Sequence, residues 1–478
     1  MPLKNDDFVL ENGHLFCNSR YDAVHFHEDD LTDCGWKTSL QLPLPTDLRS
    51  GVYALKLEQV GELGDRWLDY IPVFVRPARP VAKLCYLMPT VSMQCYELME
   101  GTANVRGADD GGAFGGTTMK AISATTMYLR QLPAERCLGR STYDLHNDGD
   151  GVKYASQLRP LLNSRPNELA WQFCAEAHVA AFLEAKGIAY DVVTDHQLHA
   201  EGVAALAPYT AVLSGTHPEY YTKPMMDALM RYSQRDGGRL LSIGANGYYW
   251  HVAFPPAGDP RGLTIAEMRR SEGGSRAWLC EPGEYYSSFS AELQGMWRRI
   301  GRPPQMLTGV GFGAQGFDIA IPYTKLAASE DPRAEFIFAG TGIEVGASFG
   351  ERGLVMGGAA GSEIDRADVS LGTPRHALRL AEATDFPSSY HHVTEEQFHA
   401  HSATTGLTNE LVRADMVFFE TAGGQGAVWS TGSIAWGGAL PINGFDNDTA
   451  KITENVIRRF IDPAPFVNPA SLAVEARL

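Results

Sequence analysis

The stretch YTAVLSGTHPEYYTKPMMDALMRYSQRDGGRLLSIGAN, residues 209–246, contains a strand, a helix and a second strand. The apolar run from Tyr209 to Ser214 predicts a buried strand, and Lys223-Pro224 opens a helix with proline in its first turn. This helix is expected to close at Asp236-Gly237-Gly238, and Arg239 to Ile243 predicts the next strand. A strand, helix, strand rhythm is typical of a parallel sheet with right-handed crossovers.

The same rhythm extends along most of the chain and indicates an α/β protein. Strands are also predicted at Lys83 to Met88, Ile188 to Val193, Ala334 to Ala339, Gly353 to Gly357, Met416 to Glu420 and Ala427 to Ser430. Further helices are predicted at Pro166 to Lys186 and at Asp448 to Ile461.

The first 80 residues differ from the rest in their hydrophobic pattern. Gly51 to Val60 largely alternates apolar and polar residues, and Tyr70 to Val75 is a second strand candidate. Such alternation after turn residues is typical of antiparallel strands. We therefore expect residues 1–80 to form a small sandwich and Arg76 to Pro80 to be a proline-stiffened linker.

Net charge, apolar runs and cysteines limit the possible partners. The 478 residues carry a formal net charge of −17, and an acidic surface repels nucleic-acid phosphates and anionic lipid. No apolar run reaches the ~20 residues of a membrane span, and no signal-peptide pattern is present at the N-terminus. The seven cysteines are scattered without CxxC spacing, which indicates reduced thiols in the cytoplasm. The pairs Arg269-Arg270 and Arg298-Arg299 are expected on solvated helix faces.

Polar residues follow two of the expected strands where each strand ends. His217-Pro218-Glu219 comes shortly after Ser214, and Gly244-Ala245-Asn246 follows the next strand. Ligands of parallel sheets bind beyond the carboxyl ends of the strands, so these turns indicate a site. The alternatives are ordinary surface turns, with Glu219 capping the helix that follows.

Common catalytic and cofactor motifs give weaker indications. No G-x-S-x-G nucleophile elbow is present. Cys95 is either a catalytic cysteine or a simple buried thiol. The glycine-rich stretches 107–116 and 309–313 lack the frame of a nucleotide-binding loop.

Two histidine pairs have the spacing of metal ligands, His25 with His27 and His399 with His401. Alternation along a strand would place both members of a pair on one face. No carboxylate or cysteine set accompanies either pair, so we expect surface histidines rather than metal ligands.

The motifs of the chain, taken in order, resemble those of the large (beta) subunit family of N,N-dimethylformamidase over nearly the whole length. The residues that carry the resemblance are Leu87-Met88-Pro89-Thr90, Cys95-Tyr96, Ser141-Thr142-Tyr143, His217-Pro218-Glu219-Tyr220, Gly244-Ala245-Asn246, Gly361-Ser362-Glu363-Ile364-Asp365 and Trp429 to Trp436. Each motif is short and modestly specific, whereas their order and spacing together are much more specific.

The resemblance implies an iron-dependent hydrolase of linear amides. The family holds a mononuclear iron, expected as Fe3+, with two tyrosines and one glutamate, which map by motif and order onto Tyr96, Tyr143 and Glu219. Phenolate and carboxylate oxygens are hard donors that suit ferric iron. His217, Asn246 and Glu363 would form the catalytic set, with His217 or Glu363 as general base and Asn246 orienting the carbonyl or stabilising the oxyanion. The implied reaction cleaves the C–N bond of a small amide such as N,N-dimethylformamide to formate and dimethylamine.

The resemblance also implies a fold and partners. The expected fold is an immunoglobulin-like β domain over residues 1–80, followed by a flavodoxin-like or glutamine-amidotransferase-like catalytic α/β domain over residues 81–478. The iron enzyme works with a small (alpha) subunit, so a small-subunit partner and an oligomer are expected. Two other functions stay open: a metal-free amidotransferase-like enzyme that uses Cys95, and a non-catalytic carbohydrate-binding module.

Overall fold

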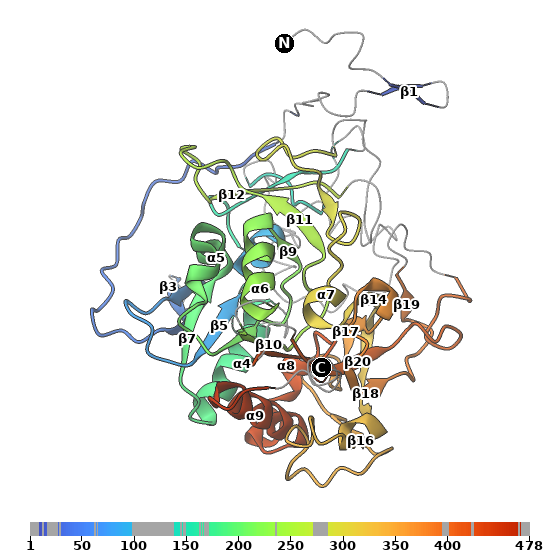
Figure 1. The fold of residues 1–478 in the computed structure, drawn as a ribbon. Helices are drawn as coiled ribbons and strands as arrows, with labels where there is room; N and C mark the ends of the chain where they lie inside the picture. Colours follow the sequence, from blue (N-terminus) through green and yellow to red (C-terminus); the bar gives the residue numbers. More distant parts are fainter. Residues whose placement is uncertain are drawn as a thin grey trace, which may run out of the picture.

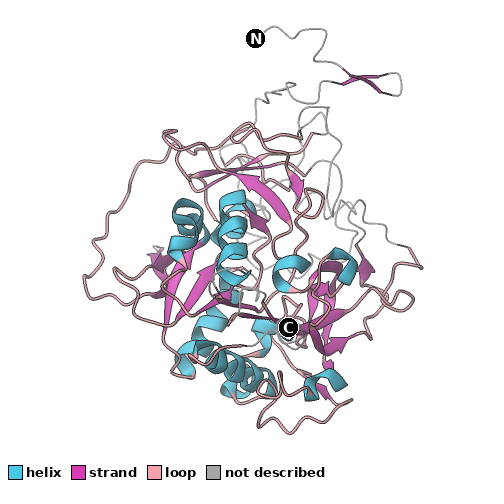
Figure 2. Ribbon diagram, viewed as in Figure 1, coloured by secondary structure: helices cyan, strands magenta, loops and turns pink. Residues whose placement is uncertain are grey.

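The structure of the chain is a computed structural model (Figures 1 and 2). It describes residues 9–11, 14–16, 27, 30–61, 64, 66–97, 138–143, 146, 150–161, 164, 166, 172–234, 237–270, 285–393, 401–421, 425–466 and 469. His25, His399 and the glycine-rich stretch 107–116 lie outside the described residues.

A nine-stranded mixed sheet forms the centre of the molecule (Figure 1). Its strands lie in the order β16 (Ser348–Phe349), β15 (Tyr323–Lys325), β18 (Leu378–Ala383), β20 (Ala414–Glu420), β21 (Ala427–Ser430), β10 (Arg239–Ser242), β8 (Ala211–Ser214), β5 (Leu84–Met88) and β7 (Tyr190–Thr194). The five strands from β21 to β7 are parallel, whereas β20, β18, β15 and β16 continue the sheet in antiparallel pairs.

The parallel half has a switch point between β5 and β8. The first parallel strand along the chain, β5, lies between the second, β7, and the third, β8. Ligands of such sheets bind outside the carboxyl ends of the strands where the order reverses. The order second-first-third-fourth-fifth is one that flavodoxin-like sheets use, and on this ground we propose a flavodoxin-like parallel half.

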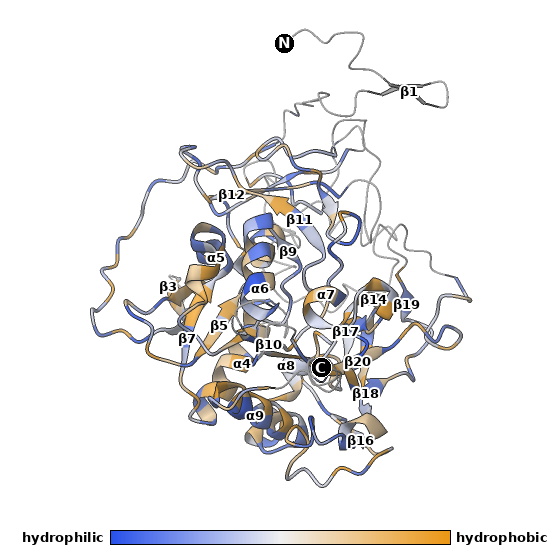
Figure 3. Cartoon of the chain, viewed as in Figure 1, coloured by the Kyte–Doolittle hydropathy of each residue, from blue (hydrophilic) through white to orange (hydrophobic). Residues whose placement is uncertain are grey.

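Helices cover both faces of the parallel strands (Figures 1 and 2). Alternate residues of β5 enter two different cores: Leu84 and Tyr86 pack with α4 (Phe173–Ala185) and α9 (Asp448–Ile461), whereas Cys85 and Leu87 pack with α5 (Asp195–Glu201) and α6 (Lys223–Gln234). Helix α9 buries one apolar side, and both hydropathy colours run along it in Figure 3. No helix among the described residues combines the length and apolar composition needed to cross a membrane.

Two smaller sheets are built from segments that follow the parallel strands. One contains β6 (Tyr154–Ser156), β9 (Tyr220–Tyr221), β11 (Trp250–Ala253), β12 (Ile265–Met268) and β13 (Gly295–Met296). The other contains β14 (Gly311–Ile321), β17 (Ala360–Arg366) and β19 (His391–His392). The shorter helices are α1 (Thr90–Cys95), α7 (Gln305–Thr308), α8 (Trp436–Ala439), η4 (Gly202–Ala205), η5 (Ala327–Glu330), η6 (Val369–Leu371) and η7 (Ile442–Phe445).

The leader contains two hairpins, β1 (Val9–Glu11) with β2 (His14–Phe16) and β3 (Gly51–Val60) with β4 (Arg66–Val75). Val52 and Phe74 pack against the core of the main sheet. Within the described residues no third strand joins β3 and β4. The immunoglobulin-like sandwich and the domain boundary near residue 80 therefore stay predictions.

Several predicted elements are confirmed, and two predicted strands are wrong. β21 and α9 have the predicted bounds, and β5, β8, β10 and α6 lie where the pattern predicts them. Residues Ala334 to Ala339 form turns, because Ala334, Ile337 and Phe338 are buried with helix-like spacing rather than alternation. Residues Gly353 to Gly357 also turn, with Met356 at φ 55°.

Helix α4 begins later than the sequence predicts. The apolar pattern runs from Pro166, but the helix begins at Phe173. Gln172 has φ 48° and ψ −126°, a conformation that cannot continue a right-handed helix. The amino end of α4 therefore lies close to the site rather than two turns beyond it.

Candidate active site

The turn after β8 is built into the interior. His217 and Glu219 are 1% and 4% exposed. The carbonyl of Pro218 accepts a bond from the backbone N–H of Tyr248 at 2.7 Å, and the carbonyl of Glu219 accepts one from Trp250 N–H at 2.9 Å. Strand β9 then pairs in parallel with β11. The alternative of a surface turn with Glu219 as a helix cap is therefore wrong.

A buried carboxylate in α4 anchors the start of this turn. Glu176 accepts hydrogen bonds from Thr216 N–H at 2.7 Å and from Thr216 Oγ1 at 2.6 Å, and a third from the hydroxyl of Tyr86. Two glycines leave room for this arrangement: a Cβ at Gly244 would lie 1.8 Å from the Thr216 carbonyl oxygen, and one at Gly215 would lie 2.9 Å from Glu176. Thr216, which precedes His217, is thus held by two hydrogen bonds to Glu176 and by close packing against Gly244.

Two tyrosines from different segments meet above the turn. Tyr96 follows α1 directly and is 3% exposed. Its hydroxyl donates to Glu219 Oε2. The ring of Tyr143 stacks on Tyr96 with centroids 4.7 Å apart, and the Tyr143 and Tyr220 hydroxyls share a hydrogen bond. The chain therefore brings Tyr96, Tyr143 and Glu219 together.

Strands β10 and β17 supply the other side of the site. His217 Nε2 lies 2.8 Å from Glu363 Oε2 and 3.3 Å from Glu219 Oε2. The side-chain N–H of Asn246 donates to the same Glu363 oxygen at 3.0 Å. His217, Asn246 and Glu363 thus form one connected network with Glu219.

Asp365 belongs to the same network, although the sequence analysis used it only as part of a motif. Its Oδ1 accepts the backbone N–H of Asn246 at 2.7 Å. Asn246 has φ 47°, which asparagine tolerates better than most residues. Asp365 stands two residues after Glu363 on β17, so strand alternation was the available signal.

Burial dominates the electrostatics of the site. Burial raises the pKa of Glu219 to about 7, and it raises that of Tyr96 well above its ordinary range. Burial raises the pKa of Asp365 to about 7 as well. For His217, burial lowers the pKa, but Glu363 and Glu219 outweigh it and the pKa is raised overall. Without a further cation these groups tend to retain protons.

Arg270 corrects one prediction from the sequence. Arg269 and Arg270 follow β12, and they are 5% and 2% exposed rather than solvated on a helix. The Arg270 guanidinium lies 4.1 Å from the ring centroid of Tyr143 and donates to the Thr142 carbonyl. Its burial depends on the packing of segments far apart in the chain, which a local charge pattern does not reveal.

The oxygen donors suit a hard, highly charged ion. Two phenol groups and one carboxylate come together, and Tyr96 and Glu219 share a hydrogen bond that a bound cation would replace. Their raised pKa values mean that both oxygens favour a proton when no metal is present. A ferric ion would reverse this preference, because it stabilises the anionic form of both ligands.

The surroundings of Cys95 oppose a nucleophilic thiol. Cys95 is fully buried, and burial followed by Glu97 and Glu219 raises its pKa well above the ordinary value. Reactive cysteines require the opposite, a lowered pKa and partial exposure.

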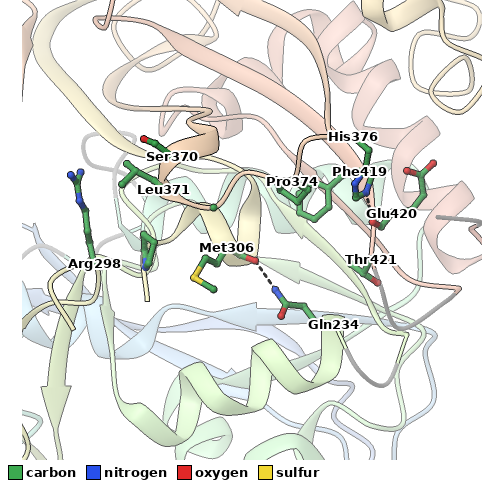
Figure 4. A pocket seen from close by; sticks show the side chains of 12 residues that line it. Gln234, Arg298, Met306, Ser370, Leu371, Pro374, His376, Phe419, Glu420 and Thr421 are labelled. Carbon is green, nitrogen blue, oxygen red and sulfur yellow. Dashed lines mark hydrogen bonds between the residues drawn. The ribbon is translucent and has the colours of Figure 1, made fainter. Parts of the chain in front are cut away.

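A large cavity lies at the other edge of the sheet (Figure 4). It has a volume of about 610 Å³ and is lined by residues including Met306, Pro374, His376, Phe419 and Glu420. Glu420 pairs with the first residue of β21, so this cavity adjoins the amino ends of the parallel strands. It contains none of the predicted site residues.

Comparisons with known proteins fit the motifs. A profile of the family described as "N,N-dimethylformamidase beta subunit-like, C-terminal" matches residues 8–449. The N,N-dimethylformamidase beta subunit of Paracoccus aminophilus is 38% identical over 466 residues, which cover 96% of this chain and 58% of that protein. The N,N-dimethylformamidase beta subunit of an Alcaligenes species is 36% identical over 464 residues, with the same coverage of 96% and 58%.

The chain thus spans somewhat more than half the length of these relatives. A ThuA-like protein from Bacteroides uniformis aligns with a TM-score of 0.30 and 13% identity, covering 62% of this chain and 89% of that one. That similarity is too low to support any conclusion.

Proposed function

The chain belongs to the N,N-dimethylformamidase beta subunit family, and from this premise we propose that it hydrolyses the C–N bond of a small amide with the help of a bound iron. The leading substrate is N,N-dimethylformamide, which water would convert to formate and dimethylamine. The observation that carries the proposal is the buried network of Tyr96, Tyr143, Glu219, His217 and Glu363 at the switch point of the sheet.

We propose Tyr96, Tyr143 and Glu219 as the iron ligands. They are the oxygen donors that meet in this network. When bound, iron would polarise the amide carbonyl and lower the pKa of a water molecule. Arg270 would offset part of the negative charge of the phenolates, because its guanidinium lies over the ring of Tyr143.

Proton transfer is assigned to the His217 and Glu363 pair. Hydrolysis requires one proton to leave the attacking water and one to reach the leaving amine nitrogen. The 2.8 Å contact between His217 Nε2 and Glu363 Oε2 lets the pair hold this proton between the two events. Glu219 lies 3.3 Å from the same nitrogen, so the imidazolium form is favoured while the proton is stored.

Asn246 is proposed to orient the reacting groups. One of its side-chain N–H groups is committed to Glu363, which fixes the direction of that carboxylate. Its Oδ1 is buried and accepts no hydrogen bond from the described residues. This oxygen can accept a hydrogen bond from the attacking water or from the amine that leaves.

We also propose that the chain works with a small (alpha) subunit in an oligomer. The support is the name of the two relatives, each a beta subunit. Size-exclusion chromatography with light scattering, with and without a co-expressed small subunit, measures the assembly. A chain that stays monomeric under both conditions contradicts this part of the proposal.

Metal analysis tests the central proposal. The wild type is compared with Tyr96→Phe, Tyr143→Phe and Glu219→Gln for iron content and for release of formate and dimethylamine. We expect one iron per wild-type chain, a phenolate-to-iron absorption band, and loss of iron in each variant. Equal iron in all four proteins, or none in the wild type, contradicts the ligand set.

Cys95→Ala separates the metal-free alternative from the proposal. We expect this variant to keep both its iron and its turnover, because a buried thiol with a raised pKa takes no part in the reaction. Loss of turnover with iron still bound would support the cysteine enzyme instead.

A further inference from the structure

A second group of metal-ligating side chains lies outside the site described above. His27, Asp30 and His146 each present a ligand atom, and these three atoms lie within 4.8 Å of one another. The side chains of His27 and His146 are only 7% and 2% exposed, and that of Asp30 is 19% exposed. The expectation of a surface histidine is therefore wrong for His27.

A further carboxylate and a lysine lie beside the cluster. A second carboxylate, Asp150, lies with its Oδ2 3.7 Å from His27 Nε2. Lys153 binds Asp150 at 2.5 Å and is the one cation that the described ion pairs place beside it, apart from the histidines. Carboxylate oxygens beside imidazole nitrogens are a donor set that divalent cations of the zinc class bind.

The separations between Asp30 and the two histidines are longer than hydrogen bonds. Asp30 Oδ1 lies 3.4 Å from His146 Nε2, and Asp30 Oδ2 lies 3.8 Å from His27 Nδ1. Hydrogen bonds between N–H and O span roughly 2.7–3.2 Å, whereas ligand atoms at about 2.0–2.2 Å from one ion lie roughly 3–3.6 Å apart. The 3.4 Å separation therefore already fits a bound ion, and the 3.8 Å separation would have to shorten. Asp30 Oδ1 is buried and accepts no hydrogen bond from the described residues.

One ring must turn before an ion can bind both histidines. The rings of His27 and His146 stack with centroids 3.6 Å apart and an angle of 4°. The lone pair of a ring nitrogen lies in the ring plane, so one ion cannot lie in two parallel planes at once. His27 is the ring expected to turn, because its contact with Asp30 is the longer one.

We propose that His27, Asp30 and His146 form a second metal site, for a borderline divalent cation of the zinc class. Two imidazole nitrogens, one carboxylate oxygen and one water would complete a tetrahedral set. The site would connect the leader to the segment that carries Tyr143, since His146 stands three residues after Tyr143. This inference does not depend on the proposed iron chemistry.

Zinc binding to the full chain tests the inference. Metal-stripped wild type, His146→Gln, Asp30→Asn and the control His401→Gln are titrated with Zn2+ against a chromophoric chelator. We expect one tight zinc in the wild type and in the control. In the two cluster variants we expect an affinity at least about 100-fold lower, because even outer partners of a metal ligand contribute about 10- to 100-fold.

A Tyr96→Phe arm separates the two metal centres. This variant should lose iron and keep the tight zinc, whereas His146→Gln should lose zinc and keep iron. Iron retained in Tyr96→Phe would contradict the proposed function and leave the zinc inference intact. Zinc lost in Tyr96→Phe would mean that zinc occupies the iron centre, and it would overturn the second site.

X-ray absorption at the zinc edge of the wild type covers the case in which a cluster variant fails to fold. Two imidazoles with oxygen neighbours support the site, and a sulfur neighbour overturns it. An absence of tight zinc in the wild type, or equal affinity in all four proteins, overturns it as well.

Discussion

The amino ends and the carboxyl ends of the parallel strands, here called the amino edge and the carboxyl edge, each have a buried glutamate and a histidine. The two edges differ in which groups lie beside these side chains. At the amino edge, Glu420 pairs with Arg333 at 3.2 Å, and His376 is hydrogen-bonded to the Glu420 carbonyl at 2.8 Å. At the carboxyl edge, His217 faces both Glu219 and Glu363. The open cavity belongs to the first edge and the crowded carboxylates to the second. A cluster of buried acidic groups around one histidine, rather than cavity size, is therefore the feature that points to the candidate site.

The largest effect is expected from neutralising one glutamate at each end of the parallel strands. We expect Glu219→Gln to lower kcat/KM at least about 1,000-fold, because it removes a proposed metal ligand and an acidic neighbour of His217. Glu420→Gln should change kcat/KM less than about threefold, since its ion pair with the partly exposed Arg333 lies at the amino ends of the strands, away from the proposed iron ligands. Steady-state assays of both variants measure this, and equal losses would remove the distinction between the edges.

The histidines provide a second matched pair. We expect His217→Gln to lower kcat about 100-fold or more, as general acid–base groups contribute about 100- to 10,000-fold. His376→Gln should leave kcat nearly unchanged. The pH–rate profile adds a separate readout, because His217→Gln should lose one limb that the His376→Gln variant keeps. A His217→Gln profile identical in shape to the wild type argues against proton transfer at this residue.

Two glutamates of α4 test how the carboxyl edge is held in place. Glu176 accepts three bonds from Thr216 and Tyr86, whereas Glu184 lies on the exposed side near Arg49. We expect Glu176→Gln to lower kcat about 10-fold through displacement of the His217 turn, as partners of a site group contribute about 10- to 100-fold. The substitution should also reduce the free energy of unfolding. The NH2 group of the new glutamine would face a group that donates to Glu176 in the wild type, so one buried donor would be left without an acceptor.

Glu184→Gln is the control and should match the wild type in both measurements. Tyr86→Phe should change kcat in the same direction as Glu176→Gln, by a smaller factor, since it removes one of the three bonds. A stability loss in Glu176→Gln with unchanged kcat and KM would mean that Glu176 supports the fold alone and does not position the site.

The smallest predicted effect concerns the pH dependence of stability in the metal-free protein. Burial raises the pKa of Asp365 to about 7, against roughly 3.9 in an unfolded chain. Between these values the folded state binds the extra proton, so stability falls as pH rises, by up to about 1.4 kcal/mol per pH unit. Urea unfolding at pH 5 and pH 7 should show a smaller fall in Asp365→Asn. Equal falls in both proteins would contradict the assigned cause.

The site residues that directly follow a predicted strand could be predicted from the sequence. His217, Glu219 and Asn246 follow apolar strands within a few residues, so strand prediction places them at one edge of a sheet. The prediction of Tyr96 and Glu363 as site residues depends on the order of the family motifs. The hydrophobic pattern alone does not separate them from an ordinary core tyrosine or an ordinary strand carboxylate.

The remainder depends on contacts between distant segments. The burial of Arg270 depends on packing against Tyr143, which is 127 positions earlier in the numbering. Glu176 receives donors from Tyr86 and Thr216, on two other strands and turns of the sheet. The segment from Ala334 to Ala339 could bury its apolar residues either as a strand or as a set of turns. Tertiary packing decides between the two, and the structure has turns.

The close approach of Gly244 to Thr216 has a consequence for protein engineering. A Cβ there would lie 1.8 Å from a backbone oxygen, and backbone cannot move aside as a flexible side chain can. Mutant libraries of the candidate site should therefore leave Gly244 and Gly215 unvaried.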